Sequence, residues 1–437
     1  MNLNPILANF QIEELNEMQN ATFNAFGKNA DLQIISPTGS GKTLAFLLPL
    51  LTQLQPDREG VQAIIVVPTR ELALQIEQVF KQMGTGFKIN CCYGGHPMRI
   101  EKNNLSHPPA VLVGTPGRIA DHLRKENIKL RDTETVILDE FDKSLEAGFQ
   151  DEMEFIFYNL SGLKKKVLTS ATALKQIPSF VAVKNLQVLD FTGNKKPVED
   201  TLEVRMVRVQ GDDKLEALML LLGKLSGKSV IVFCNHREAV NRISEQLSKH
   251  RIPHGFYHGG LEQIDREKTL IKLRNGSTPI LITTDLAARG LDIPEIEVVV
   301  HYQLPASLDV MIHRNGRTAR MNAGGIAYFL LDIDDFLPEF IHVKPLEDSL
   351  PAVFRIPEAP QWRTLYFSAG KKDKINKMDI VGMLLQKAKL KKEELGKIEV
   401  LDFSAYAAVA SSKIEETVNL VRDEKIKGKR VKIAIAN

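Results

Sequence analysis

An eight-residue phosphate-binding signature near the N-terminus constrains this chain more than any other feature. It follows the apolar, strand-like run Leu32–Ile35 and precedes an apolar helical stretch. A strand, a glycine-rich loop and a helix start in this order form a P-loop, whose backbone N–H groups converge on phosphates at the helix N-terminus. The sequence therefore predicts an α/β domain with a nucleoside triphosphate site, lined by Ser36, Pro37, Thr38, Gly39, Ser40, Gly41, Lys42 and Thr43.

Roles within the P-loop follow from its chemistry. We expect Lys42 to reach the β- and γ-phosphates and the Thr43 hydroxyl to bind Mg²⁺. A second element, the apolar run Val136–Leu138, ends in the acids Asp139 and Glu140. Buried acids at the end of a strand are costly unless a cation compensates them. We expect Asp139 to hold Mg²⁺ through water, and Glu140 to position and deprotonate the attacking water. The expected cofactors are a nucleoside triphosphate and Mg²⁺; the family resemblance described below implies that the nucleotide is ATP.

Short runs of β-branched residues alternate with amphipathic helical stretches along most of the chain. This rhythm predicts parallel sheets covered by helices on both faces. It is interrupted at Asp190–Glu203, a charged stretch with Gly193 and Pro197, which we interpret as an interdomain linker. We therefore expect two successive α/β domains. Their predicted strands are Leu32–Ile35, Ala63–Val67, Ala110–Val113, Thr135–Leu138 and Lys166–Thr169, then Ser229–Phe233, Ile280–Thr283, Ile296–His301 and Ile326–Leu331.

A different pattern follows the proline-rich stretch Lys344–Gln361. Prolines at this density oppose both helix and sheet interior, which predicts a second linker. After it the order βαββαβ in about 75 residues indicates a split-βαβ module, a common RNA-binding architecture. Ser412 to Glu415 have the spacing of a capping box that opens its second helix.

Positive charge is concentrated in this last module. Residues Thr364–Asn437 carry 16 Lys and Arg against 10 Asp and Glu, a net charge of +6, whereas the whole chain carries only +3. A basic module on a weakly acidic body favours a polyanionic partner. The alternative is a merely soluble basic surface.

Other classes of protein are disfavoured. No run of about 18 apolar residues predicts a membrane span, and the N-terminus lacks the pattern of a signal peptide. Cys91, Cys92 and Cys234 make neither a disulfide framework nor a zinc site, and each lies in or beside an apolar run. We expect buried free thiols and a cytoplasmic protein that is monomeric and has no membrane partner.

Further motifs make the chain resemble the DEAD-box RNA helicases. The string from Asp139 to Asp142 reads DEFD, with Phe141 in place of the family's alanine. PTRELA begins at Pro68, GG at Gly94, TPGR at Thr115 and SAT at Ser170; the second domain carries TDLAARGLD and HRNGRTAR, similar to the family's TDVAARGLD and HRIGRTGR. The motifs keep the family's order over about 300 residues. The resemblance implies two tandem RecA-like parallel-sheet domains, at 1–195 and 200–343, then a linker at 344–362 and a small RRM-like α+β domain at 363–437.

The resemblance also implies roles for individual residues. Gln19 would read adenine and Asp292 the ribose, although the surroundings of Gln19 lack the family's usual Gly, Pro and upstream aromatic residue. Arg317 and Arg320 would stabilise charge on the γ-phosphate. Residues that couple the motifs would be Asp142, Ser170, Thr172 and His313. Candidate contacts to the RNA backbone are Thr69, Arg70, Gly95, Thr115 and Arg118 in the first domain, and Gln263, Arg266 and Thr284 in the second.

Two segments of the C-terminal module, Leu365–Lys374 and Lys425–Val431, resemble the RNA-binding domain of the DbpA-type helicases. In that family it binds a structured hairpin in large-subunit ribosomal RNA, which implies a role in ribosome assembly. Tyr366, Phe367, Phe403 and Tyr406 are candidates for base stacking, with core packing as the alternative for at least half of them. The candidate phosphate contacts are Lys371, Lys372, Lys374, Lys427, Lys429 and Arg430.

The expected function is RNA-stimulated ATP hydrolysis coupled to local unwinding of RNA duplexes. Phe141 leaves one alternative open, because a phenyl ring in place of alanine needs extra volume, and overpacking a core costs about 1–3 kcal/mol. The chain would then be an ATP-gated RNA-binding clamp with little turnover. A second alternative is a general RNA chaperone or helicase whose C-terminal module is a nonspecific tether.

Overall fold

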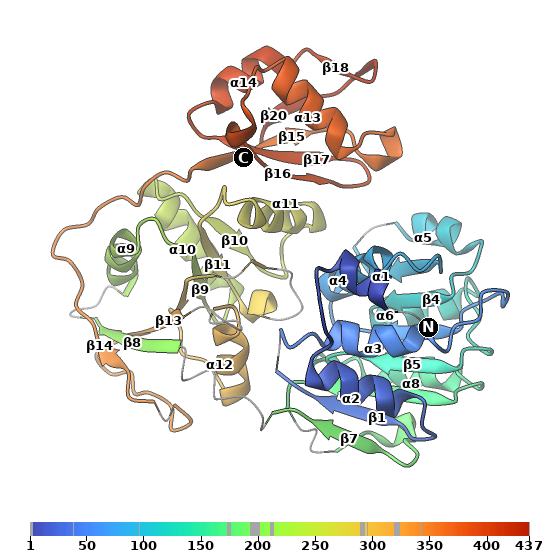
Figure 1. Ribbon diagram of the computed structural model, residues 1–437. Coiled ribbons are helices and arrows are strands. Elements are labelled where there is room, and N and C mark those ends of the chain that lie inside the picture. Colours follow the sequence, from blue (N-terminus) through green and yellow to red (C-terminus); the bar gives the residue numbers. More distant parts are fainter. Residues whose placement is uncertain are drawn as a thin grey trace. The chain divides into compact units, whose positions relative to one another are not determined.

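The structure is a computed structural model that carries all side chains (Figure 1). It describes residues 3–37, 39–95, 97–172, 176–192, 202–209, 214–288, 293–294, 296–318, 324–341 and 343–436. The chain divides near residue 197 into two compact units, and the second unit holds a seven-stranded sheet, a separate four-stranded sheet and a two-stranded hairpin. None of the helices within the described ranges is long and apolar enough to cross a membrane.

The first unit is built on a seven-stranded parallel sheet of order β3-β4-β2-β5-β6-β1-β7. Its central strands are buried at every position, and successive residues contribute to different core clusters: Ala63 and Ile65 to one, Ile64 and Val66 to the other. This is the pattern expected of strands covered on both faces. The strands are β1 Leu32–Ile35, β2 Ala63–Val66, β3 Ile89–Cys92, β4 Val111–Gly114, β5 Thr135–Leu138, β6 Lys165–Ser170 and β7 Gln187–Asp190.

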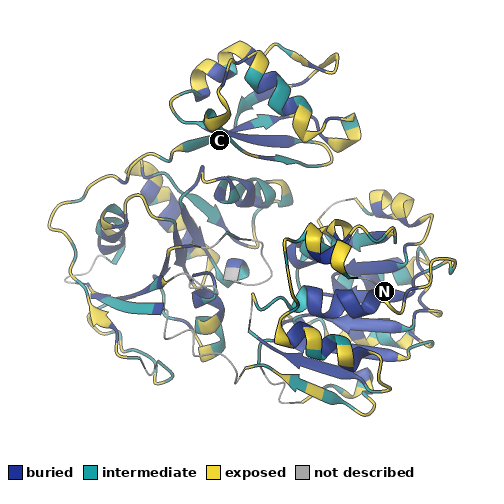
Figure 2. Cartoon of the chain, viewed as in Figure 1, coloured by how far each residue is buried: buried dark blue, intermediate teal, exposed yellow. Residues whose placement is uncertain are grey.

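Helices cover both faces of this sheet. One core cluster contains side chains from α2, α3 and α4, and the other contains side chains from α6, α7 and α8. The buried strands stand out in Figure 2 as dark ribbons flanked by helices with exposed outer faces. The helices are α1 Asn4–Asn9, α2 Glu17–Phe26, α3 Lys42–Leu51, α4 Arg70–Gln82, α5 Met98–Leu105, α6 Pro116–Arg124, α7 Phe141–Glu146 and α8 Gln150–Tyr158.

The second unit begins with another seven-stranded parallel sheet, of order β10-β11-β9-β12-β13-β8-β14. Its strands are β8 Leu202–Arg208, β9 Val230–Phe233, β10 Gly255–Tyr257, β11 Ile280–Thr283, β12 Val298–His301, β13 Gly325–Leu331 and β14 Leu346–Glu347. The helices of this part are α9 Lys214–Lys224, α10 Arg237–Lys249, α11 Gln263–Arg274 and α12 Leu308–Asn315. All the strands predicted from apolar runs in both parts are present, with ends shifted by a few residues.

The C-terminal part, drawn in orange and red in Figure 1, has its own sheet and its own core. Its antiparallel sheet has the order β16-β17-β15-β20, with helices α13 and α14 between strands. The predicted βαββαβ order is confirmed, with a small extra hairpin before the last strand. The bounds are β15 Trp362–Phe367, α13 Lys377–Gln386, β16 Leu395–Val400, β17 Ala405–Ala410, α14 Ile414–Val421, β18 Lys425–Ile426, β19 Lys429–Arg430 and β20 Ile433–Ile435.

One local prediction here is wrong. Lys413 occupies the N-cap position of α14, and its side chain makes no capping hydrogen bond. The capping box predicted from Ser412 and Glu415 therefore does not form. Instead, the Glu415 carboxylate accepts a hydrogen bond of 2.8 Å from Arg363 on β15. A tertiary partner for the glutamate outweighs the local motif.

The proline-rich segment that precedes β15 is packed on the second sheet. β14 adds to the edge of that sheet beside β8. Asp348 follows β14 and receives hydrogen bonds from Lys224 (2.6 Å), Tyr328 (2.8 Å) and Arg205 (3.1 Å). Leu350 and Phe354 pack against the core of the same domain. Prolines oppose helix and sheet interior in this segment, but they permit the short edge strand β14 and side-chain packing along the segment.

The three cysteines have the predicted environment. They are free; Cys92 and Cys234 are buried and Cys91 is half-buried. Burial raises the pKa of each thiol. They are therefore uncharged at neutral pH and act as small apolar side chains.

The Asp348 cluster gives a first testable prediction. Burial alone would raise the pKa of this carboxyl, but hydrogen bonds from Lys224, Tyr328 and Arg205 lower it from 3.8 to about 2. Asp348→Asn should therefore reduce the free energy of unfolding by about 1–3 kcal/mol at pH 7. A lowered folded-state pKa stabilises above the unfolded pKa, so the difference between wild type and variant should shrink as the pH falls from about 4 to 2.

Urea denaturation followed by circular dichroism would measure both effects. Asp334→Asn, a change at an exposed aspartate of the same domain, is the control and should leave stability unchanged at every pH. Equal losses of stability for the two variants at pH 7 would contradict the role assigned to Asp348.

Candidate nucleotide and RNA sites

The order of strands in the first sheet sorts the motifs into two groups. The P-loop follows β1, SAT closes β6, and the DEFD acids follow β5; these three strands are neighbours in the sheet. PTRELA, GG and TPGR follow β2, β3 and β4, which form the other side of the sheet. Because parallel strands put their carboxyl ends at one edge, the expected nucleotide residues gather on one half of that edge and the expected RNA residues on the other.

The P-loop backbone has the conformation that its glycines allow. Gly39 and Gly41 have φ angles of 81° and 89°, in the left-handed region that favours glycine. The Lys42 ammonium donates hydrogen bonds to the carbonyls of Ser36 (2.5 Å) and Pro37 (2.9 Å), so it points back into the loop. Phosphate oxygens in the loop could replace these carbonyls as its partners.

Helix α2 holds the P-loop through its first residues. Asn16 caps the helix and forms a reciprocal capping box with Gln19. The Asn16 side chain also donates to the Ser40 carbonyl (3.0 Å), and Gln19 donates to that of Gly41 (3.3 Å). The buried Gln19 therefore lies beside the P-loop, as its assignment requires. Sequence analysis overlooked Asn16, although its spacing of three residues from Gln19 is the signal of a capping box.

Asp139 is buried at the end of β5, and burial raises its pKa. Thr169, on the adjacent strand β6, donates a short hydrogen bond to its carboxylate, and the positive charge of Lys42 partly offsets the effect of burial on the pKa. The backbone N–H of Glu140 donates to both Asp139 Oδ1 and Thr169 Oγ1, each at 3.2 Å. A buried hydroxyl that was not predicted therefore holds the two acids together. The parallel register of β5 with β6, which places Leu138 opposite Leu168, sets Thr169 beside Asp139.

Glu140 has φ 48° and ψ 50°, the left-handed conformation that is uncommon for residues other than glycine. Phe141 follows as the first residue of α7 and is completely buried in the core cluster that includes Met153 and Ile156. The phenyl ring is thus housed in the core beneath the sheet. Asp142, the last residue of DEFD, lies 3.6 Å from the buried Lys143 ammonium. Within SAT, the Ser170 hydroxyl donates to the Thr172 carbonyl at 2.7 Å.

Residues expected to contact RNA in the first domain lie close together. Gly95 has φ 96°, and a Cβ at this position would lie 2.2 Å from an Arg70 guanidinium nitrogen, so Arg70 packs directly on the GG loop. Thr69 and Thr115 are the N-cap residues of α4 and α6. The Thr69 hydroxyl accepts a hydrogen bond from the Leu72 N–H at 3.3 Å, so it has a capping role in this structure.

Glu101, on α5, connects the GG and TPGR motifs. One carboxylate oxygen accepts from the Tyr93 N–H (2.9 Å), and the other accepts from Arg118 (3.1 Å) and the His122 ring (2.7 Å). Cys92, Glu101 and His122 present potential metal-binding atoms within 4.8 Å of one another. Both Glu101 oxygens are occupied, however, and His122 Nδ1 accepts from Asn127, so His122 Nε2 carries the proton given to Glu101. Glu101 and His122 therefore belong to a hydrogen-bond network with Tyr93, Arg118 and Asn127.

In the second domain Arg314 organises the loops beyond the strands. It is fully buried, pairs with Asp285 through two hydrogen bonds of 2.6 and 3.1 Å, and donates to Asn235 and to the Gln303 carbonyl. Asp285, Asn235 and Gln303 follow β11, β9 and β12, so one guanidinium joins three neighbouring strand ends. Sequence analysis gave Arg314 no role of its own.

Asn315 stands where the family's HRIGRTGR motif has isoleucine, and it has a hydrogen-bond partner elsewhere in the domain. Its side chain is hydrogen-bonded to His301 at 2.9 Å, and His301 stacks on Phe329. Burial and the nearby Arg314 charge lower the pKa of His301 to about 3, so this histidine stays neutral at physiological pH. His313 and Arg317 are also buried. Three residues assigned to the nucleotide lie outside the described ranges: Thr38, Asp292 and Arg320.

The RNA candidates of the second domain lie around the start of α11. Gln263 is its first residue and donates to Glu267 at 3.2 Å. Arg266 is buried and donates to the Leu261 carbonyl at 3.2 Å, so part of its donor capacity shapes the loop. Thr284 follows β11, and its N–H donates to the Tyr257 carbonyl at 3.4 Å.

The basic candidates of the C-terminal domain are all exposed or half-buried, and folding brings two groups of them together. Lys427, on the β18–β19 hairpin, donates to the Lys374 carbonyl at 2.9 Å, while Lys429 lies 3.4 Å from Asp373.

The aromatic candidates of this domain differ in how far they are buried. Phe367 and Tyr406 are buried, Tyr366 is half-buried, and only Phe403 of the four is well exposed, at 62%.

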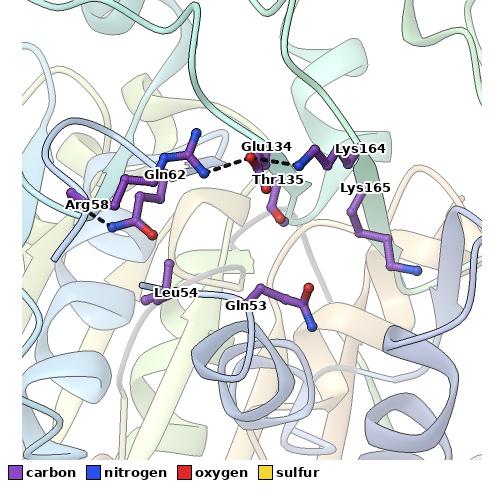
Figure 3. A pocket seen from close by; sticks show the side chains of 8 residues that line it. All are labelled: Gln53, Leu54, Arg58, Gln62, Glu134, Thr135, Lys164 and Lys165. Atoms are coloured by element: carbon purple, nitrogen blue, oxygen red, sulfur yellow. Dashed lines mark hydrogen bonds and ion pairs between the residues drawn. The ribbon is translucent and has the colours of Figure 1, made fainter. Parts of the chain in front are cut away.

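A polar pocket of the first domain lies away from these motifs (Figure 3). Thr135 and Lys165 on its wall begin β5 and β6, so it belongs to the amino ends of the strands. Glu134 is paired there with Arg58 (2.7 Å) and Lys164 (2.9 Å), and hydrogen bonds from Lys164 and Arg58 lower its pKa. The pocket is therefore an ion-pair cluster at the edge opposite the expected chemistry.

Comparison with known proteins agrees with this geometry. Residues 16–180 match the DEAD/DEAH box helicases, residues 213–322 the helicase conserved C-terminal domain, and residues 364–435 the DbpA RNA binding domain. The chain is 31% identical, over 98% of its length, to the ATP-dependent RNA helicase DbpA of Escherichia coli (strain K12), and covers 98% of that protein. The chain belongs to the DbpA-type DEAD-box RNA helicases. It is therefore an ATP-dependent RNA helicase with a DbpA-type RNA-binding domain at its C-terminus.

Other relatives support the same conclusion. The chain is 29% identical to the ATP-dependent RNA helicase DbpA of Bacillus subtilis (strain 168), with 97% of this chain and 95% of that protein covered. Two solved structures resemble the fold with a TM-score of 0.69: S. cerevisiae Dbp5 bound to RNA and ADP BeF3 (25% identity, 79% and 93% covered), and Mss116p bound to ssRNA and AMP-PNP (26% identity, 80% and 77% covered). The predicted fold class, two RecA-like domains and a small α+β domain, is confirmed.

The hydrogen bonds of Thr169 lead to a second prediction. Thr169→Val keeps the shape of the side chain but removes the donor to Asp139 and the acceptor for the Glu140 N–H. Removing a supporting hydrogen bond of this kind typically reduces activity by about 10–100-fold, so RNA-stimulated phosphate release should fall by that factor. Nucleotide binding should change less, because the P-loop is untouched.

Thr133→Val is a matched control. Thr133 is equally buried, but its hydroxyl donates to the Val61 carbonyl (2.8 Å), before the amino end of β5. Its variant should retain wild-type turnover at equal stability. Equal loss of turnover in both variants would mean that Thr169 supports only the fold.

Proposed function

We propose that this helicase couples RNA-stimulated ATP hydrolysis to local unwinding of RNA duplexes, and that its C-terminal domain directs it to large-subunit ribosomal RNA during ribosome assembly. The observation that carries the proposal is the DbpA RNA binding domain that follows two helicase domains, in a chain that matches DbpA relatives over nearly its whole length. A helicase core that contacts backbone and ribose has little sequence preference, so targeting must come from another domain.

Hydrolysis requires a polarised water and a stabilised γ-phosphate. In this proposal Glu140 orients the water and accepts its proton, while Lys42 and the P-loop amides hold the phosphates. The Thr169 bridge supports this assignment, because it fixes the backbone of Glu140 relative to Asp139. Arg317 and Arg320 of the second domain are the proposed partners of the γ-phosphate, and Asp142, Ser170, Thr172 and His313 couple the motifs.

The residues around Asp139 fit a magnesium ion bound with ATP. A fully buried carboxyl whose pKa is raised by burial needs a compensating cation in order to ionise. Asp139 and Thr43 would hold the ion, which when bound would draw negative charge from the phosphates. Gln19 would select adenine, Asp292 the ribose, and the P-loop residues Ser36 to Thr43 the phosphates.

The RNA strand is proposed to follow the other half of the sheet edge. Thr69, Arg70, Gly95, Thr115 and Arg118 offer hydroxyls, amides and guanidinium groups suited to phosphate and ribose. Gln263, Arg266 and Thr284 would continue this surface in the second domain. The RNA-bound states of Dbp5 and Mss116p, relatives of similar fold, support a strand held by such a core.

One observation bears on the alternative of a clamp with little turnover. Phe141, the residue that motivates it, is fully buried in the core, while Asp139 and Glu140 remain at the end of β5. If Phe141 reduces turnover, it therefore does so by overpacking the core and not by occupying the nucleotide site. Whether RNA accelerates phosphate release separates the two functions.

Removing the proposed base is the most direct test. Glu140→Gln keeps the size of the side chain but removes proton acceptance, so steady-state phosphate release should fall by about 10²–10⁴-fold. Binding of ATP and RNA should persist, measured by fluorescence anisotropy with labelled RNA. Lys42→Ala, by contrast, should weaken nucleotide binding as well as turnover, because it removes a phosphate-binding cation. Retained multiple turnover in Glu140→Gln would contradict the assignment.

A fourth prediction concerns targeting by the C-terminal lysines. Replacing Lys371, Lys372 and Lys374 by alanine in the full chain should raise the half-saturating concentration of ribosomal RNA and reduce the preference over random RNA. The salt dependence of binding should weaken by about 0.7–0.9 in log–log slope for each phosphate that the variant no longer neutralises. The ATPase rate at saturating RNA should stay the same, because the hydrolytic residues lie elsewhere.

The control removes two other exposed lysines of the same domain, Lys391 and Lys392, and should leave RNA stimulation unchanged. If the triple variant keeps the wild-type half-saturating concentration, the basic surface has no targeting role. A lower saturated rate would instead mean that the surface shapes the helicase core.

A further inference from the structure

The sheet of the C-terminal domain is in contact with helix α11 of the second helicase domain. Both belong to one compact unit, and both are labelled in Figure 1. Arg274, the last residue of α11, forms two parallel hydrogen bonds with Glu399 on β16, of 2.9 and 2.7 Å. Both side chains are less than one-fifth exposed. A bidentate guanidinium–carboxylate pair of this kind fixes orientation as well as distance.

A buried chain of hydrogen bonds lies next to this ion pair. Asn275 donates to the Thr364 hydroxyl (2.9 Å), which in turn donates to the Ser277 hydroxyl (2.8 Å). All three side chains are buried in this contact, so separation of the domains would break both hydrogen bonds and expose the three polar groups to water. Because Thr364 is on β15 and the other two residues follow α11, this network joins the domains directly.

Apolar and aromatic side chains complete the contact. Ile271 of α11, Tyr406 of β17 and Ala436 form one buried cluster, against which Tyr366 packs. The rings of Tyr366 and Tyr406 lie 5.5 Å apart. Trp362 approaches Gly276, where an added Cβ would lie 3.3 Å from the indole ring. The sheet face that carries Tyr366 and Tyr406 is therefore covered by this chain's own helix and is not available for stacking on bases.

The segment leading to β15 is fixed as well. The Glu358 N–H donates to the Ser226 hydroxyl at 2.9 Å, and Phe354 packs edge-on against His250 at a ring distance of 6.4 Å. A Cβ on Gly223 would lie 2.5 Å from the Arg355 carbonyl oxygen, so the segment runs directly over α9. The sequence predicted a linker here, and a linker that acted as a flexible tether would show none of these contacts.

We propose that helix α11 is a rigid bridge that holds the C-terminal RNA-binding domain at a fixed distance from the RNA strand in the helicase core. Its first turn carries Gln263 and Arg266, assigned above to the strand, and its last residue carries the ion pair to Glu399. Arg274 lies eight positions after Arg266 along the helix, a rise of about 12 Å. This inference rests on the proposed function and adds a geometric rule: the core acts on RNA at a set spacing from the anchored site.

A rigid bridge and a flexible tether predict different responses to spacing. A tether lets the core reach duplexes over a broad range of distances, with an effective concentration that varies slowly with length. A bridge permits simultaneous engagement only when the RNA spans the fixed gap. Unwinding should therefore pass through a sharp maximum as the spacing between anchor and duplex changes.

Charge reversal offers a test that keeps the chain intact. Arg274→Glu and Glu399→Arg each place like charges in contact, and the double variant restores an opposite pair. The probes are a large-subunit ribosomal RNA fragment joined to a short duplex by single-stranded spacers of increasing length. Wild type and the double variant should show one sharp optimum, whereas each single variant should lose about tenfold in unwinding rate at that spacing and show a broad profile. Binding of the fragment alone should be unchanged.

The matched control reverses a pair within the C-terminal domain. Arg363 and Glu415 are joined by a 2.8 Å contact but are far more exposed, at 40% and 71% of their side chains. Arg363→Glu and Glu415→Arg should keep the sharp optimum. Wild-type profiles in Arg274→Glu and Glu399→Arg, or a broad profile in wild type, would overturn the proposal.

A measurement without RNA distinguishes failure of the bridge from failure of the proposed function. Dyes at Ser248→Cys on α10 and Asn419→Cys on α14, both exposed positions, report the distance between the domains by single-molecule energy transfer. Cys91→Ser removes the one native thiol that is not fully buried. Wild type should give one narrow population, and each single charge variant an additional broad one that the double variant removes. A broad wild-type distribution rejects the bridge; a narrow one without RNA unwinding rejects the proposed function alone.

Discussion

Both helicase domains depend on one constraint, which is that all strands of each large sheet run in the same direction. When parallel strands are joined by crossover helices, the carboxyl ends of all strands lie at the same edge of the sheet. The loops that follow these ends can vary without disturbing the core, and they all meet at that edge. In the first domain six motifs use six strand ends in this way. The sequence distance between PTRELA and SAT is therefore unrelated to their distance in space, which only the strand order determines.

The position of the polar loops at one edge of the sheet does not by itself fix their conformation. Buried charged side chains that hydrogen-bond to several loops do so. Arg314 and Glu101 each have at least three hydrogen-bond partners, contributed by different strand ends or motifs. An unpaired charge in such positions would cost several kcal/mol, so the loops must adopt the arrangement that supplies every partner. The desolvation of one ionic group thereby specifies the conformation of several loops at once.

The sequence was sufficient for what depends on local order. Apolar periodicity located the strands, and the ordered motifs located the P-loop, Asp139 and Glu140. It could not reveal Thr169, whose role follows from the register of β6 against β5. It also could not reveal the role of Asn315 on α12, whose partner His301 lies on β12. The segment before β15 was interpreted as a linker, because a high density of prolines indicates the absence of helix and sheet interior but does not reveal side-chain contacts such as those of Asp348 and Phe354.

Glu140 shows how stability and the proposed chemistry compete at a single position. Its left-handed backbone is costly for a residue with a Cβ, typically by about 1 kcal/mol or more, whereas glycine adopts that conformation without strain. Selection for thermal stability alone would therefore favour glycine at the turn after β5. In directed evolution for thermostability, substitutions at this turn should enrich when hydrolysis is not selected and disappear when it is. The residue found at this turn would thus indicate whether a population of variants was selected for stability alone or also for hydrolysis.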